Sequence, residues 1–111
     1  MDSAEKKHLK HAYSKHAKEF STKTKVNLFK GSMEIEQRLD LVIEGRVQGV
    51  GYRYFAKIKA ESLCIKGSVK NMRDGTVFLT AQGEKESMES FVRWCHQGPP
   101  SANVRKIHKV Q

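Results

Sequence analysis

Residues 45–55, GRVQGVGYRYF, place glycines and arginines between an apolar run and a segment with helical spacing. Gly49 and Gly51 lack Cβ atoms, so the main chain there can approach an oxyanion closely. If a helix begins near Tyr52, its first amides and the positive end of its dipole point at the same place. Arg53 adds a planar guanidinium group that can hold two oxygens of one anion. The stretch therefore predicts a cradle for an anionic group such as a phosphate.

The same spacing has a second interpretation. A strand that turns tightly into a helix also uses glycines with positive φ, and Arg53 would then be a surface charge. The stretch matches neither of two well-known phosphate loops. No Gly-Lys-Ser or Gly-Lys-Thr follows it, and Tyr54 stands where the dinucleotide fingerprint needs its third glycine. Spacing alone leaves the anion cradle and the structural turn equally open.

Hydrophobic periodicity predicts the elements on either side of this loop. The expected elements are a strand at 39–47, a helix at 52–63, strands at 67–73 and 76–81, a helix at 84–95 and a strand at 103–110. Asp74 and Gly75 predict a type I′ hairpin turn between the second and third strands. The order predicts an α+β fold, a ferredoxin-like βαββαβ sandwich with an antiparallel sheet and two helices on one face.

The start of the chain differs from the rest in charge. The net charge is +9, and residues 1–32 alone carry eight lysines against three acidic residues. A thin apolar stripe, Leu9, Tyr13, Ala17 and Phe20, would suit a weak amphipathic helix, and a flexible basic arm is the alternative. Gly31-Ser32 before Met33 resembles a cloning junction, which would make part of 1–32 a tag. We assign 1–37 as a basic N-terminal extension and 38–111 as one domain.

The cysteine content and the lack of a long apolar run indicate the cellular compartment and the redox state in which we expect the protein. Cys64 and Cys95 have no metal-binding spacing, and no run of about 18 apolar residues could span a membrane. We therefore expect a monomeric cytoplasmic protein with both thiols reduced and buried, and without a metal or a cofactor.

Three segments carry a resemblance to a known family: GRVQGVGYRYF, KGSVKNMRDGTVFLTAQG and FVRWCHQGPPSANVRKIHKV. Their order and spacing resemble the acylphosphatase pattern G-x-V-Q-G-V-x-F/Y-R, then G-x-V-x-N, D-G-x-V and Q-G. The late Phe, Trp and Gly-Pro positions recur as Phe91, Trp94 and Gly98-Pro99. The resemblance runs from about Leu39 to Val110 and is specific.

The resemblance implies hydrolysis of small acyl phosphates to a carboxylate and inorganic phosphate, without a metal. Arg53 then takes the role of the phosphate-binding arginine and Asn71 that of the residue that orients the attacking water. The phosphate-binding loop would be formed by the backbone amides of Gln48, Gly49, Val50, Gly51, Tyr52 and Arg53. Without the resemblance, Asn71 would be read as a turn residue. A carboxylate is already a stable leaving group, so a general acid is not required.

This sequence departs from the family pattern at three places. Ser68 stands where a tryptophan is common, which removes a large apolar contact beside Asn71. Cys64 stands where a glycine often caps the first helix, so a left-handed backbone there would cost about 1 kcal/mol. Family members also continue for about a dozen residues past the fourth strand, whereas this chain stops at Gln111. We therefore expect an unpaired sheet edge and a less stable fold.

Two other functions remain open at this level. The chain could be a non-catalytic ferredoxin-like module that binds RNA or an acidic protein through its basic arm, although we do not expect nucleic acid or a membrane as a partner. It could also be a domain of a larger enzyme. Removal of residues 1–32 would distinguish the first alternative, because hydrolysis should survive the deletion and salt-sensitive binding should not.

Overall fold

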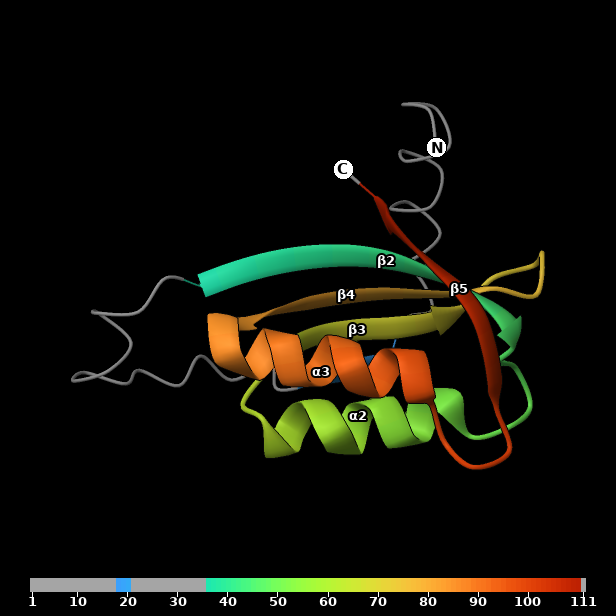
Figure 1. Cartoon of the computed structure of the whole chain (residues 1–111), viewed down its shortest axis with the longest axis horizontal. Coiled ribbons are helices and arrows are strands. Elements are labelled where there is room, and N and C mark those ends of the chain that lie inside the picture. Colours follow the sequence, from blue (N-terminus) through green and yellow to red (C-terminus); the bar gives the residue numbers. More distant parts are fainter. Residues whose placement is uncertain (1–17, 21–35, 111) are drawn as a thin grey trace.

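The computed structural model describes residues 18–20 and 36–110 (Figure 1). In chain order the elements are β1 (Lys18–Phe20), β2 (Glu36–Arg46), α2 (Tyr52–Ser62), β3 (Lys66–Asn71), β4 (Val77–Glu84), α3 (Lys85–Gln97) and β5 (Asn103–Val110). The expected order of strands and helices from residue 38 onward is therefore confirmed.

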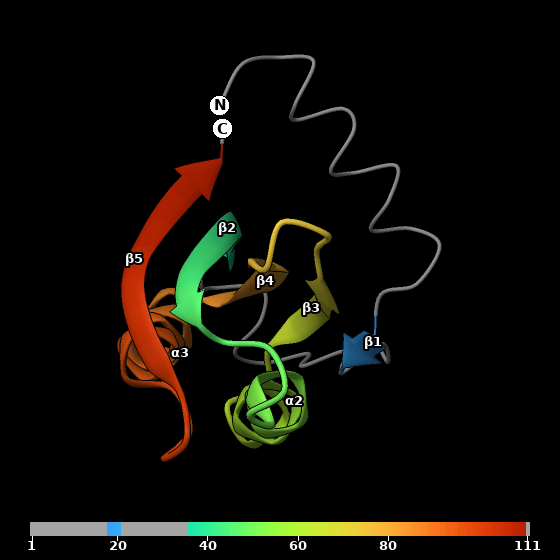
Figure 2. The same cartoon turned by 90° about the vertical axis from the view of Figure 1, so that its right-hand side faces the viewer.

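The strands form one sheet in the order β1-β3-β4-β2-β5, and every neighbouring pair is antiparallel. Both helices lie on the same face of the sheet (Figures 1 and 2). This is the ferredoxin-like α+β sandwich that the periodicity predicts. No helix among the described residues is long and apolar enough to cross a membrane.

The core lies between the sheet and the two helices. The first helix presents Tyr52, Ala56 and Ala60 to this core, and α3 presents Met88, Phe91 and Cys95. Phe55, three residues after the buried Tyr52, has a side chain that is 42% exposed. Three residues advance a helix by about 300°, so Phe55 falls at the margin of the buried stripe.

The largest difference from the sequence-based expectation concerns β1. We expected an unpaired sheet edge, because the chain stops at Gln111. Instead, Lys18–Phe20 pairs antiparallel with β3, opposite residues 67–69 (Figure 2). Phe20 is buried at 1% exposure, and its ring meets Phe91 edge-on with centroids 6.2 Å apart. The sheet therefore has five strands, and the last 3 residues of the proposed weak helix form a strand.

The remainder of the proposed N-terminal helix, the basic arm and the Gly31-Ser32 junction lie outside the described residues. The boundary at residue 37 and the origin of residues 1–32 stay predictions. The expectation that hydrolysis survives removal of residues 1–32 needs revision, however, because Phe20 fills part of the core. Such a deletion would remove buried apolar surface together with the arm.

Two predictions about turns have different outcomes. The hairpin between β3 and β4 forms, but type I′ would need positive φ at both central residues, and only Gly75 has it, at +91°. The turn closes instead with the Gly75 N–H donating to the Met72 carbonyl at 3.2 Å. Cys64 has the left-handed backbone that the family's glycine position implied, because its φ is +57°.

The cysteines differ in burial. Cys95 is buried in α3, as expected, whereas Cys64 is exposed and not buried as we expected. The reason is local, since Cys64 follows the C-terminus of α2 in the turn that leads to β3. Neither residue is in a disulfide.

Candidate active site

The glycine-rich stretch forms the loop between β2 and α2, with Gly49 at φ +72° and Gly51 at φ +80°. Gly51 is the N-cap of α2 in the left-handed conformation, which glycine adopts at little cost. Among the described residues no side chain caps this helix, and its first turn holds no acidic residue. The first amides of α2 and its dipole are therefore available to an anion.

A cavity of about 140 Å³ opens at this helix N-terminus. It is lined by Lys18, Val47, Gly49, Gly51, Tyr52, Arg53, Tyr54 and Asn71. The loop, the start of α2 and the end of β3 thus bring Arg53 and Asn71 to one cavity, although they lie 18 positions apart in the sequence. The lining includes two cationic side chains and no carboxylate, so an anion is the complementary ligand.

The side chains of Arg53 and Asn71 are both without a partner in the described part of the chain. The Asn71 Oδ1 atom is buried and accepts no hydrogen bond there. A buried polar atom without a partner is costly, and such atoms are often satisfied by a bound water or ligand. The half-buried Arg53 makes no ion pair with a described residue, whereas Arg46 on β2 is exposed and lies outside the cavity lining.

Gln48 has a role that the sequence did not reveal. Its Nε2 group donates to the Met72 carbonyl at 2.7 Å and to the Thr76 carbonyl at 2.8 Å. These bonds join the loop before α2 to the hairpin that follows Asn71. The resemblance assigned only the backbone of Gln48 to the cradle, and nothing in the spacing indicated a partner 24 residues away. The Gln48 side chain fixes the loop relative to Asn71.

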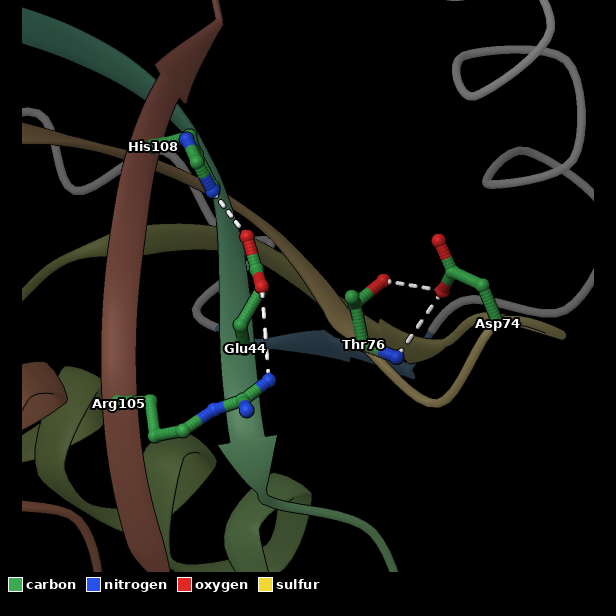
Figure 3. Close-up of polar contacts among 5 residues, drawn as sticks. All are labelled: Glu44, Asp74, Thr76, Arg105 and His108. Atoms are coloured by element: carbon green, nitrogen blue, oxygen red, sulfur yellow. Dashed lines mark hydrogen bonds and ion pairs between the residues drawn. The ribbon is translucent and has the colours of Figure 1, made fainter.

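The hairpin is also fixed by its own side chains (Figure 3). Asp74 accepts hydrogen bonds from the Thr76 N–H at 3.0 Å and from the Thr76 hydroxyl at 2.6 Å. These bonds lower the pKa of Asp74 below its ordinary value, against a smaller opposing effect of burial. The turn after Asn71 is therefore held from within and by Gln48.

Tyr52 lines the cavity but its hydroxyl is used elsewhere. The hydroxyl donates to the Cys95 carbonyl at 2.8 Å, and the ring lies against Trp94 with centroids 5.3 Å apart. Burial raises the pKa of Tyr52 far above its ordinary value and raises that of the Cys95 thiol to about 12. Neither group is suited to proton transfer, and Tyr52 instead anchors the start of α2 to α3.

Two other features lie away from this cavity. A wider hollow of about 650 Å³, bordered by β2, α3 and β5, includes Arg38, Arg93 and Lys109 in its lining but none of the loop residues. On the face of β2, Glu44 lies between His108 and Arg105 of β5, and its contact with Arg105 measures 3.7 Å (Figure 3). Neither feature touches Arg53 or Asn71, so we place the candidate active site at the smaller cavity.

Comparison with known proteins decides the family. The family model described as Acylphosphatase matches residues 39–111 of this chain. The chain belongs to the acylphosphatase family. It is accordingly an acylphosphatase, a hydrolase. An acylphosphatase of Acaryochloris marina is 48% identical over 69 residues, which cover 62% of this chain and 74% of that protein.

Solved structures agree with the acylphosphatase assignment. The crystal structure of an acylphosphatase from Bacillus subtilis has a TM-score of 0.65 and 36% identity, over 68% of this chain and 83% of that one. A full-length HypF structure in the phosphate- and nucleotide-bound form has a TM-score of 0.58 and 30% identity, over 71% of this chain and 11% of that chain. The same fold thus occurs alone and within a larger protein.

Proposed function

We propose that this chain hydrolyses the carboxyl-phosphate bond of acyl phosphates to a carboxylate and inorganic phosphate, without a metal ion. Arg53 and the amides of residues 48–53 bind the phosphoryl group, and Asn71 orients the attacking water. The observation that supports this most strongly is the single cavity at the N-terminus of α2, which Arg53 and Asn71 line together. The proposal includes a small-molecule substrate and a monomeric enzyme.

The cradle supplies electrostatic stabilisation. In the transition state of phosphoryl transfer, negative charge is spread over the three outer oxygens, so fixed donors aimed at those oxygens lower the barrier. Arg53 offers a fork of N–H donors, and the open N-terminus of α2 offers backbone amides. Because the loop glycines and the Gln48 bonds fix these donors beforehand, little reorganisation is needed when substrate binds.

Asn71 positions the nucleophile. Its side chain has an acceptor and two donors, and the buried Oδ1 has no partner among the described residues. A water bound to this oxygen would stand beside the phosphoryl group, in place for attack on phosphorus. An amide is too weak a base to remove the proton, so the substrate phosphate accepts it.

The departing carboxylate needs no proton donor. The lining of the cavity contains no histidine, cysteine, aspartate or glutamate, so it offers neither an acid/base pair nor a set of metal ligands. Acyl phosphates suit such a site because their leaving group is a weak base. Phosphate monoesters, which release a basic alkoxide, should be poor substrates.

The proposal is tested with benzoyl phosphate in the presence of excess chelator. Hydrolysis should persist in chelator and should fall at least about 100-fold in kcat/KM for Arg53→Gln, the scale of a lost transition-state donor. Arg46→Gln is the matched control, since Arg46 is exposed and outside the cavity lining. Loss of activity in chelator that added metal restores would contradict metal independence, and equal rates in the two variants would contradict the role of Arg53.

A further inference from the structure

A second cation, Lys18, lines the same cavity as Arg53 and Asn71. It comes from β1, which lies beside β3 and contacts α2 (Figure 2). Lys18 is the strand partner of Val69, so the two residues share a face of the sheet. Asn71 lies two positions beyond Val69 and therefore on that face too. The register of β1 thus brings Lys18 to the end of the sheet where the cavity opens.

Phe20 holds this register. It lies on the same face as Lys18 and is buried in the core against Phe91. A shift of β1 by one residue would turn Phe20 out of the core, so burial of this one ring specifies where Lys18 stands. Lys18 itself remains exposed, with no ion-pair partner in the part of the chain that the structure describes.

The charge of the cavity lacks compensation. Lys18 and Arg53 contribute two positive charges to a cavity of about 140 Å³, and no lining residue is acidic. Like charges at one site repel each other unless an anion lies between them. A phosphoryl group, with about two negative charges, would balance both. Lysine and arginine serve different parts of such a group, since the ammonium acts as a point charge and the guanidinium as a fork.

We propose that Lys18 is a second cationic ligand of the phosphoryl group, supplied to the active site by β1. The inference rests on the proposed function, since it names a further residue of the same site. Lys18 binds the phosphate oxygens in substrate and in product alike. Its loss should therefore weaken binding of inorganic phosphate as well as hydrolysis.

The test compares the full chain with Lys18→Met, Lys18→Arg and Lys85→Met. Lys85 is an exposed lysine at the start of α3. It follows the last residue of β4, whereas Asn71 pairs with the first residue of that strand. Lys85→Met therefore removes one positive charge far from the cavity and controls for net charge. Calorimetric titration with inorganic phosphate measures binding independently of catalysis. Lys18→Met should raise the Kd about three- to tenfold, the effect of one partly exposed charged contact, and Lys18→Arg should recover most of it. The difference in Kd between Lys18→Met and the unaltered chain should become smaller at high salt, because salt screens the charge of Lys18.

Other outcomes separate this inference from the proposed function. If the unaltered chain hydrolyses benzoyl phosphate but Lys18→Met binds phosphate as well as Lys85→Met does, the role of Lys18 is wrong and the proposed function stands. If the unaltered chain binds phosphate through Lys18 without hydrolysing benzoyl phosphate, the proposed function is wrong and the ligand role stands. If the unaltered chain hydrolyses benzoyl phosphate without binding inorganic phosphate, the role of Lys18 is wrong, and if it does neither, both are wrong. Equal melting temperatures of the variants show that folding is not the cause.

Discussion

Replacement of Phe20 by alanine tests whether β1 belongs to the folded enzyme. The ring is 1% exposed and contacts Phe91 edge-on. Truncation of a buried phenylalanine costs about 3–5 kcal/mol where the surroundings stay in place. Here β1 has only 3 residues, so it can detach from the sheet when Phe20 is truncated. The loss of stability then cannot exceed the free energy with which β1 docks on the rest of the fold. We expect Phe20→Ala to lower the free energy of unfolding by about 2–4 kcal/mol.

Chemical denaturation followed by circular dichroism measures this difference, and thermal unfolding should show a melting temperature lower by at least about 8 °C. Ile58→Ala is the matched control, because Ile58 is 46% exposed on α2 and alanine favours a helix. Phe20→Ala should also weaken phosphate binding as Lys18→Met does, since Lys18 would no longer be held at the cavity. A loss no larger than that of Ile58→Ala would refute the docking of β1.

Three further predictions follow from single contacts. Gln48→Ala removes two hydrogen bonds between the loop and the hairpin, so kcat should fall about tenfold or more in a steady-state assay; an unchanged kcat would exclude the positioning role. Cys64→Gly should raise the free energy of unfolding by about 1 kcal/mol, because φ is +57°, whereas Cys64→Ala should not. The pKa of Glu44 lies below its ordinary value of 4.5, chiefly because its side chain forms a hydrogen bond with His108. The nearby cations lower this pKa further, and desolvation opposes the shift. A lowered carboxyl pKa stabilises the fold above the unfolded value and loses that effect as pH falls, so Glu44→Gln should flatten the acid limb of a stability curve; parallel curves would contradict this.

The order of strands and helices from residue 38 onward was predictable because the signals repeat along each element. Alternating residues along β2 and the helical stripe of α3 each extend over several positions, so one exception changes little. The positive φ angles of Gly49 and Gly51 were predictable from residue type, and the left-handed backbone of Cys64 was predictable from the family pattern. These backbone conformations are local, and residue type largely decides them.

Strand β1 was not predictable by the same means. It has 3 residues, of which Lys18 and Glu19 are charged, so no periodicity can be read from it. Only the burial of Phe20 and pairing with a strand about 50 residues away make it a strand, and both are tertiary effects. The Gln48 bonds to the hairpin are long-range in the same sense. Lys18 therefore looked like one of many lysines in a basic arm.

We propose that the cradle binds the phosphoryl group and that Asn71 orients the water, and Asn71→Ala separates these two roles. We expect kcat for benzoyl phosphate to fall at least about 100-fold in Asn71→Ala, while the Kd for inorganic phosphate changes less than about threefold. An unchanged kcat would contradict the role of Asn71 in orienting the water. So would a loss of phosphate affinity as large as the loss of rate, because Asn71 would then belong to the binding cradle.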